Sequence, residues 1–292
     1  MKFGENRNSL DVQQWQEWLK NLPNFVNQIA NHWQLSNLQA LPNLSYNHVL
    51  SCVQNEKPVI LKICFCKKEL QSEVNALQAF AGHGCINLLA HNVKLGALLL
   101  QDATPRTSLK TLFPAQDEQA VKIISNVITN LQRALIPSHG EFQNISDLLK
   151  TLEKNWDIPQ KYIETARNLS KQLLATTAKQ VLLHGDLHHD NILLSKSNQW
   201  IVIDPKGVIG DPVYEVGASI RNPIPELLEN NDAKNIIQNR INLFADLLNF
   251  DKNRISDWSY VQAVLSACWA IEDGHDTAYC VKFLEVLESI LG

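Results

Sequence analysis

Residues 181–207 read VLLHGDLHHDNILLSKSNQWIVIDPKG and combine short apolar runs with a dense set of polar groups. Each run is bounded by polar turn residues, which predicts three buried strands, Val181–Leu183, Ile192–Leu194 and Trp200–Ile203. A β-hairpin formed by the second and third runs would bring Asn191 and Asp204 together near its base. Asp186 lies in the loop between the first two runs. The sequence therefore predicts two oxygen ligands and one further carboxylate in one place.

These residue types suit phosphoryl transfer. Magnesium prefers oxygen ligands and is held by one or two protein side chains together with substrate phosphates. Kinases place a metal-binding Asn a few residues after the catalytic Asp, and a second metal-binding Asp at the end of the following strand. Asn191 and Asp204 fit the two metal positions, and Asp186 fits the group that accepts the proton of the attacking hydroxyl.

A zinc site is the alternative for this segment, since it contains His184, His188 and His189. Zinc sites use a nearby Cys or a helical His-Glu pattern, and the segment has neither. We therefore expect His184 to make hydrogen bonds that fix the loop.

The same motifs resemble a known family. His184-Gly185-Asp186-Leu187-His188 followed by Asn191, and Ile203-Asp204-Pro205-Lys206-Gly207, resemble the aminoglycoside phosphotransferase family of kinase-like enzymes. The continuation VIGDPVYEVG at 208–217, with Arg221-Asn222-Pro223, is similar to its streptomycin 6-phosphotransferase and hydroxyurea phosphotransferase branch. The resemblance runs from about Leu44 to the end. It implies an α+β, protein-kinase-like bilobal fold with a small antiparallel β N-terminal lobe and a large, mainly helical C-terminal lobe. It also implies ATP, Mg²⁺ and a hydroxyl acceptor.

The N-terminal third supplies a candidate nucleotide lysine. The pattern after Leu44 predicts a β-hairpin formed by two segments, Val49–Val53 and Pro58–Cys64. Lys62 lies inside the apolar second strand, where it needs a charge partner or an exposed head. Kinases pair such a lysine with a helix glutamate and use it to hold the phosphates. In the helix predicted over 67–81, Glu73 matches that glutamate and Glu69 is the weaker alternative.

A break in the pattern at residues 101–105, after strands predicted at 86–89 and 95–100, matches the hinge of a kinase. The Gln101 carbonyl and the Ala103 amide are the predicted adenine partners. We place the boundary here, with a nucleotide-binding lobe and its leading helices at 1–102, and a helical lobe with the catalytic loop and acceptor pocket at 103–292. The turn LSYNHVLS at 44–51 has no glycine, which leaves Ser45, Asn47 or backbone amides to contact phosphate.

Amphipathic spacing predicts helices before and after these strands. Ser9 is the predicted cap of a helix over 10–19, and Pro23 separates it from a second helix over 25–33. The later helices are predicted at 117–135, 146–156, 162–177, 223–249 and 256–291.

Three further features lie in the C-terminal part of the chain. By resemblance, Asp211 should hydrogen-bond back to the catalytic loop, whereas Arg221 either holds a nearby carboxylate or is solvated. Glu272, Asp273 and Asp276 form an acidic group at a predicted helix end. They are either a solvated helix terminus or part of an acceptor pocket that binds amines or guanidines, and the resemblance supports the second interpretation.

Composition limits the partners. The 292 residues carry a net charge of −4, which does not favour nucleic acid or an anionic membrane and is compatible with a cationic small acceptor. Six dispersed Cys without CxxC spacing predict reduced thiols. An apolar leader and a membrane-length run are both absent, so the cytoplasm is the expected compartment. We expect a monomer or weak dimer.

The predicted function is ATP-dependent transfer of a phosphoryl group to a hydroxyl of a streptomycin-type aminoglycoside or of hydroxyurea. One alternative is a metabolite kinase of the same fold that acts on choline, a sugar or an amino sugar. A nucleotide-binding pseudokinase is the other, and the intact set of site residues argues against it: Lys62, Asp186, Asn191 and Asp204.

Overall fold

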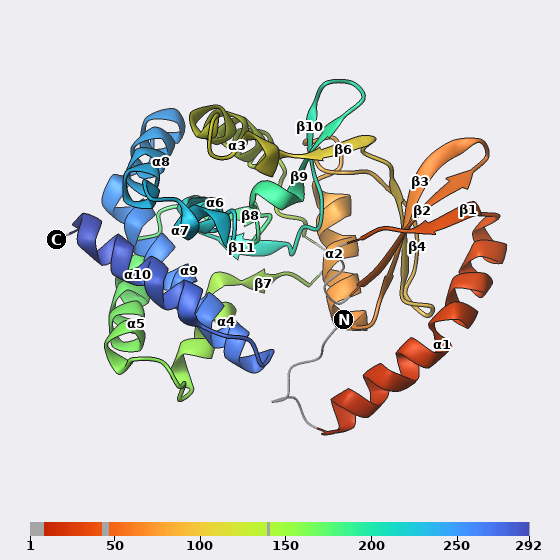
Figure 1. Ribbon diagram of the computed structural model, residues 1–292, viewed down its shortest axis with the longest axis horizontal. Helices are drawn as coiled ribbons and strands as arrows, with labels where there is room; N and C mark the ends of the chain where they lie inside the picture. Colours follow the sequence, from red (N-terminus) through yellow and green to blue (C-terminus); the bar gives the residue numbers. More distant parts are fainter. Residues whose placement is uncertain (1–8, 43–46, 139–140, 292) are drawn as a thin grey trace.

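An antiparallel sheet of five strands forms the smaller of two lobes (Figure 1). The computed structural model describes residues 9–42, 47–138 and 141–291. Within the sheet the order is β1-β2-β3-β5-β4. The strands are β1 Ser36–Ala40, β2 Asn47–Gln54, β3 Lys57–Cys64, β5 Ala97–Gln101 and β4 Leu88–Asn92.

The predicted hairpin is confirmed as β2 and β3. Its register pairs Gln54 with Lys57, so that Asn55 and Glu56 form a two-residue turn. Both have positive φ, 47° and 63°, which gives the turn the twist that joins adjacent antiparallel strands.

Alternation along β3 decides which way Lys62 points. Val59, Leu61 and Ile63 are at most 3% exposed and pack in a small core beneath the first helix. Because successive side chains of a strand face opposite sides, Lys62 lies on the other face, toward the larger lobe.

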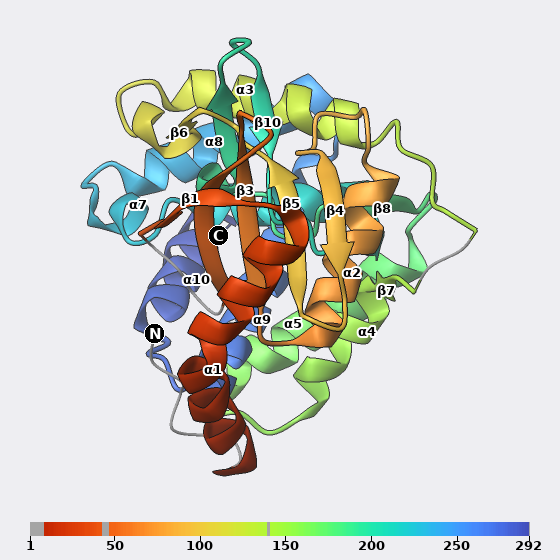
Figure 2. The same cartoon turned by 90° about the vertical axis from the view of Figure 1, so that its right-hand side faces the viewer.

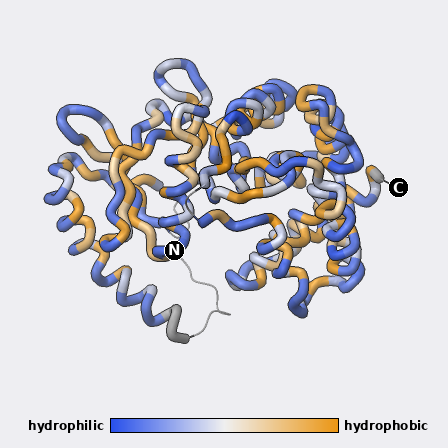
Figure 3. The backbone as a smooth tube through the Cα atoms, turned by 180° about the vertical axis from the view of Figure 1, so that it is seen from behind, coloured by the Kyte–Doolittle hydropathy of each residue, from blue (hydrophilic) through white to orange (hydrophobic). Residues whose placement is uncertain are grey.

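A single helix, α1 Ser9–Trp33, covers the outer face of the sheet (Figure 2). The expected separation into two helices at Pro23 is wrong, because the helix continues through that residue. Proline removes one backbone hydrogen bond, to the carbonyl four residues earlier. Apolar residues spaced along both halves keep α1 on the sheet, and its hydropathy alternates accordingly (Figure 3). Packing of the amphipathic face therefore outweighs the lost bond.

The helix α2 Lys67–Ala79 lies on the inner face of the sheet, beside the larger lobe (Figure 1). Leu70, Val74 and Leu77 recur at helical spacing, are at most 1% exposed and belong to the core that extends into that lobe. The opposite lobe approaches α2 closely. A Cβ atom added to Gly207 would lie 2.9 Å from the Cβ of Ala76.

The three strands predicted around the polar loop are confirmed as β8 Val181–Leu183, β9 Ile192–Ser195 and β10 Trp200–Val202. The second and third form the predicted hairpin, and β9 also pairs with β6 Pro105–Ser108. Strand β8 pairs with β11 Val208–Gly210, which pairs in turn with β7 Gln143–Asn144. These two small sheets present the polar loop to the cleft between the lobes.

Helices make up most of the larger lobe, as predicted. The α-helices are α3 Asp117–Leu131, α4 Ile145–Leu149, α5 Gln160–Ala175, α6 Val216–Arg221, α7 Glu226–Glu229, α8 Ala233–Leu248, α9 Lys252–Glu272 and α10 Ala278–Leu291. Short 3₁₀ turns are η1 Leu109–Leu112, η2 Lys150–Glu153, η3 His189–Asn191 and η4 Pro212–Glu215. Helix α9 is central and packs against α5, α6, α8 and α10.

Two further expectations concern cysteines and membrane spans. All six Cys are free thiols, and five of them are buried. In the described part of the chain, no helix combines the length and the apolar character that crossing a membrane requires.

Candidate active site

A cavity of about 920 Å³ lies between the lobes and is lined by residues from both. It brings together five of the side chains singled out in the sequence: Lys62, Glu73, Asp186, Asn191 and Asp204. A smaller, mostly apolar cavity of about 210 Å³ adjoins it and shares Lys62 and Asp204 with it. The predicted gathering of oxygen ligands and a further carboxylate is therefore present in the fold.

Lys62 joins the two lobes electrostatically. Its Nζ donates to both carboxylate oxygens of Glu73 at 2.8 Å, and to Oδ1 of Asp204 at 3.0 Å. Burial alone would lower the pKa of Lys62, but the carboxylates of Asp204 and Glu73 raise it above its ordinary value. Lys62 therefore stays charged, and its helix partner is Glu73, the first choice from the sequence.

Asp204 has an unusual backbone conformation next to Asn191. The Ile203 N–H donates to the Asn191 carbonyl at 3.0 Å, which fixes the base of the hairpin. Asp204 itself has φ 60°, in the left-handed region that a non-glycine residue rarely adopts. Burial would raise the pKa of Asp204, but Lys62 holds it below its ordinary value. Such strain is typical of functional positions, and it turns an ionised carboxylate into the cleft.

Asn191 is oriented by its neighbours in the loop. Its Nδ2 donates to the Asp186 carbonyl at 2.9 Å and lies 3.2 Å from Nε2 of His188. The amide nitrogen is thus turned toward the loop. Among the hydrogen bonds of the described residues, none engages the amide oxygen of Asn191. The Asp186 side chain is 40% exposed, and His188 Nε2 lies 3.9 Å from its Oδ1.

The backbone of the loop is held by Glu215, a residue that our sequence analysis did not assign. Its carboxylate accepts the N–H of His184 at 2.6 Å and that of Gly185 at 3.0 Å. Gly185 has φ 84°, and a Cβ there would lie 2.8 Å from Val208. Glu215 is 3% exposed, and burial raises its pKa to about 7. Glu215 lies in the Tyr214-Glu215-Val216-Gly217 segment that supported the family resemblance, but the sequence analysis considered only Asp211, four residues earlier.

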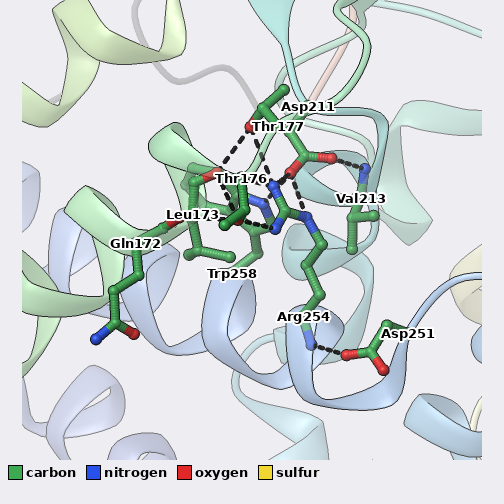
Figure 4. Close-up of polar contacts among 9 residues, drawn as sticks. All are labelled: Gln172, Leu173, Thr176, Thr177, Asp211, Val213, Asp251, Arg254 and Trp258. Carbon is green, nitrogen blue, oxygen red and sulfur yellow. Dashed lines mark hydrogen bonds and ion pairs between the residues drawn. The ribbon is translucent and has the colours of Figure 1, made fainter.

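The expected contact of Asp211 with the catalytic loop is wrong. Asp211 accepts the Val213 N–H at 3.0 Å, the Trp258 indole N–H at 2.8 Å and the Arg254 Nε–H at 2.6 Å (Figure 4). Arg254 also donates to the Leu173 carbonyl and to Thr176. The carboxylate begins the η4 turn and faces the helices beneath, whereas Glu215, four residues later, faces the loop. The family resemblance implied the contact for Asp211, but it is Glu215 whose carboxylate bonds to the loop.

His184 holds the loop through its two ring nitrogens. His184 is fully buried, its Nε2 donates to the Ile203 carbonyl at 2.8 Å, and its Nδ1 accepts the Asp186 N–H at 3.2 Å. Burial lowers the pKa of His184 to about 4, which keeps the ring neutral. Throughout the residues with a described position, no three His, Cys, Asp or Glu side chains converge on one point as a zinc site would require. His184 therefore makes the loop-fixing bonds that we expected.

The smaller cavity has the walls that a nucleobase would need. Leu41, Val49 and Ile60 line one side, while Leu100, Gln101 and Ala103 line the end at the hinge. Beside them, Arg106 makes a bidentate ion pair with Asp102 at 2.7 and 2.8 Å. Asn47 lines both cavities, whereas Ser45 lies outside the described residues.

The acidic group at the end of α9 does not join this arrangement. Glu272, Asp273 and Asp276 are absent from the walls of both cavities. Glu272 accepts a bond from Lys154 at 2.8 Å, and Asp276 accepts the Ala278 N–H at the start of α10. Their acceptor-binding role stays a prediction without support from the cavity.

The arrangement fits a hard divalent cation. An amide oxygen and an ionised carboxylate, from Asn191 and Asp204, face one polar cavity, and such oxygen donors suit Mg²⁺. Lys62 would neutralise phosphate charge on one side of this point, and the half-exposed Asp186 would meet a hydroxyl on the other.

Comparison with known proteins also indicates a kinase. The model of a protein family described as aminoglycoside/hydroxyurea antibiotic resistance kinase matches residues 32–274. Streptomycin 6-kinase of Streptomyces glaucescens is 23% identical over 270 residues, which cover 89% of this chain and 86% of the relative. Hydroxyurea phosphotransferase of Kitasatospora aureofaciens is 26% identical over 289 residues, which cover 94% of this chain and 81% of the relative.

Solved structures confirm the kinase-like fold. Aminoglycoside phosphotransferase APH(4)-Ia, in a ternary complex with ADP and hygromycin B, matches with a TM-score of 0.67 and 13% identity over 91% of this chain and 97% of its own. Choline kinase LicA from Streptococcus pneumoniae matches with a TM-score of 0.65 and 14% identity over 94% of this chain and 98% of its own. At these identities the likeness concerns the fold alone.

Proposed function

Because the chain belongs to the aminoglycoside/hydroxyurea antibiotic resistance kinase family, whose members phosphorylate hydroxyl groups, we propose that it transfers the γ-phosphoryl group of ATP to a hydroxyl of a small-molecule acceptor. One observation carries this proposal. Four side chains suited to phosphoryl transfer line a single cavity between the lobes: Lys62, Asp186, Asn191 and Asp204.

The N-terminal lobe and the hinge bind the nucleotide in this proposal. Gln101 and Ala103 bind adenine through backbone groups at the end of the smaller cavity. Lys62, fixed by Glu73, contacts the phosphates. Two solved structures of similar fold, APH(4)-Ia with ADP and LicA with AMP, support this use of the cleft.

Asn191 and Asp204 would hold Mg²⁺, which neutralises phosphate charge when it is bound. Lys62 contacts the same carboxylate at 3.0 Å, so the site would concentrate positive charge where the phosphoryl group is transferred. Asn191 keeps its orientation through a bond to the Asp186 carbonyl, which preorganises its oxygen.

Asp186 orients the acceptor hydroxyl and accepts its proton. As the acceptor oxygen forms its bond to the γ-phosphorus, the bond to the leaving ADP oxygen breaks, and the proton passes to the Asp186 carboxylate. Glu215 and Gly185 fix the backbone around this carboxylate, so its position does not depend on substrate. Catalysis in this scheme rests on positioning and charge neutralisation.

The relatives name two kinds of acceptor, an aminoglycoside and hydroxyurea. A panel of streptomycin, hydroxyurea, choline and an amino sugar, followed by ADP release in the presence of Mg²⁺, tests the proposal. We expect turnover with at least one of them. Choline or the sugar as the preferred acceptor would indicate a metabolite kinase.

The control for this assay is Asp186→Ala. It removes the proton acceptor and leaves the nucleotide contacts, so we expect nucleotide affinity to be kept and turnover to fall by roughly 10²- to 10⁴-fold. Full activity of the Asp186→Ala enzyme would remove this residue from the mechanism.

A further inference from the structure

Arg106 lies where the two cavities of the cleft meet. It lines both the smaller, mostly apolar cavity beside the hinge and the large polar cavity. Among the described residues, Lys62 is the only other cation that lines both. Lys62 comes from the sheet of the smaller lobe, whereas Arg106 belongs to β6, which pairs with β9. A molecule that fills both cavities therefore lies beside Arg106.

The hinge fixes the guanidinium of Arg106. Its Nε and Nη2 donate to the two carboxylate oxygens of Asp102 at 2.7 and 2.8 Å. Asp102 lies between Gln101 and Ala103, the predicted adenine partners, and its side chain is 2% exposed. Burial would raise the pKa of Asp102, but the bonds from Arg106 hold it below its ordinary value. Both groups are therefore charged, and the guanidinium keeps its position without a ligand.

The ion pair leaves one edge of this guanidinium unused. The Arg106 side chain is 30% exposed, and no acceptor among the described residues is bonded to its Nη1. The structural arginines of the larger lobe differ in this respect. Arg240 and Arg254 each use all three guanidinium nitrogens, on carboxylates, carbonyls or hydroxyls. Arg106 thus retains donors that the fold does not use.

Arg221, in contrast, is excluded from the cleft. It is 7% exposed and lines neither cavity, and its Nε and Nη1 are enclosed without a hydrogen-bond partner among the described residues. Neither expectation from the sequence, a nearby carboxylate or a solvated side chain, is met. Of the arginines with a described position, Arg106 is the one that lines the two cavities of the cleft.

The backbone of Arg106 is strained at the same point. Its φ is 63°, in the left-handed region that a non-glycine residue rarely adopts, and its N–H donates to the Ala103 carbonyl at 2.8 Å. Such conformations are costly and cluster at functional sites. Backbone and side chain thus both hold Arg106 against the hinge, where the smaller cavity opens into the larger one.

The cleft needs a group of this kind. Kinases cover the nucleotide phosphates with a glycine-rich loop. Residues 44–51 contain no glycine, and the member of this segment that lines both cavities is Asn47. An asparagine side chain carries no charge, so a phosphate at the junction depends on cations from elsewhere. Lys62 is one, and Arg106 is the second.

Resting on the kinase function proposed above, we propose that Arg106 is a nucleotide-binding residue that donates from Nη1 to the phosphate nearest the ribose. With the base at the hinge and the outer phosphates beside Lys62, the ribose and the first phosphate lie at the junction of the two cavities. A guanidinium binds phosphate oxygens through charge-assisted hydrogen bonds. The ligand class is therefore a nucleoside 5′-phosphate, and the contact distinguishes AMP, ADP and ATP from adenosine.

Affinities for AMP and adenosine test this contact. Arg106→Met keeps the apolar stem and removes the guanidinium. We expect the Kd for AMP, and for ADP with Mg²⁺, to rise by roughly 10- to 100-fold, the loss of one charge-assisted hydrogen bond. The rise should be intermediate in Arg106→Lys, and the Kd for adenosine should be unchanged. Titration calorimetry measures each Kd. An unchanged Kd for AMP, or equal rises for AMP and adenosine, would refute the contact.

Asp102→Asn separates the contact from a structural role of the ion pair. It removes the carboxylate charge and leaves the guanidinium in place, so the Kd for AMP should rise far less than in Arg106→Met. The double variant Asp102→Asn/Arg106→Met leaves no stranded buried carboxylate, and it should lose AMP affinity as Arg106→Met does. If Asp102→Asn alone weakens AMP binding as much as Arg106→Met, the ion pair is structural and the contact is refuted.

Lys110→Met is the charge-matched control. Lys110 lines the large cavity but not the smaller one, and it is paired with Glu226 at 2.6 Å. Its loss removes one positive charge from the cavity wall without touching the junction, so the Kd for AMP should change little. A rise equal to that of Arg106→Met would show general attraction in place of a contact, which would refute the proposal.

Binding without turnover keeps the two proposals distinguishable. A wild-type protein that binds AMP and Mg²⁺-ADP but phosphorylates no acceptor is not the proposed kinase, and the AMP affinities still decide the role of Arg106. A wild-type protein that phosphorylates an acceptor while Arg106→Met keeps its AMP affinity refutes the contact alone. Absence of any nucleotide binding by the wild-type protein would refute both proposals.

Discussion

Glu215 couples the catalytic loop to pH through a single buried carboxyl. Its pKa of about 7 in the folded protein lies above the ordinary value of 4.5, so folding favours the protonated form. Stability contributed by that proton is complete below pH 4.5 and is lost as the pH rises to 7. The two backbone bonds to His184 and Gly185 remain available to the ionised carboxylate.

We predict that Glu215→Gln removes this pH dependence. Relative to the variant, the wild-type protein should lose on the order of 3 kcal/mol of unfolding free energy between pH 4.5 and pH 7. Urea unfolding at four pH values from 4.5 to 8 measures the difference. Parallel stability profiles for the two proteins would show that Glu215 titrates normally.

The convergence of the polar side chains in the cleft was predictable from the sequence, and the residue that holds the loop backbone was not. Asp186 and Asn191 lie in one loop, and two apolar runs that pair as a hairpin separate Asn191 from Asp204, so the convergence of the three side chains followed from the hairpin. Glu215 bonds to backbone N–H groups, which every residue except proline has, so the sequence contains no particular residue type that would identify its partners. Asp211 was expected to contact the loop because the family resemblance implied it.

The helices α5 and α9 and the η4 turn are tied together by one ionic contact. Arg254 at the start of α9 binds Asp211 at the start of η4, and reaches the Leu173 carbonyl near the end of α5 at 2.8 Å (Figure 4). Asp211 is 4% exposed, so loss of its partner would leave an unpaired carboxylate inside the lobe.

We predict that Arg254→Met destabilises the protein by about 3 kcal/mol, the typical cost of removing one partner of a buried pair. Arg133→Met, at an exposed position after α3, is the control and should change the unfolding free energy little. Adding Asp211→Asn to Arg254→Met should recover part of the loss. Additive effects of the two substitutions would mean that the pair is not coupled.

Element boundaries were less predictable than element types. The hairpin of β2 and β3 was evident from a polar turn between apolar runs, whereas α1 passes through Pro23 against the local preference. Tertiary packing against the sheet keeps α1 continuous through Pro23. A single sequence does not show which surface a helix will pack against.

Residues of both lobes line the cleft in which we propose that the nucleotide binds, so a nucleotide should stabilise the whole molecule. At a nucleotide concentration 100 times Kd, with Mg²⁺ present, we expect the melting temperature to rise by about 4 °C. A chelator should abolish most of the rise, because Asn191 and Asp204 would hold the cation. Lys62→Met should reduce the rise even with Mg²⁺, and an unchanged rise in that variant would place the nucleotide elsewhere.

The position of α2 has a consequence for regulation. Helix α2 carries Glu73, packs beneath the sheet and touches Gly207 of the other lobe through Ala76. Protein kinases that are activated by an inward movement of the corresponding helix need a second, outward position for that helix in the inactive state. Here α2 packs against the sheet and against the larger lobe, and Glu73 is already paired with Lys62. We therefore expect the rate of turnover to depend on substrate concentration. A modification that activates by moving this helix inward would have no displaced helix to move.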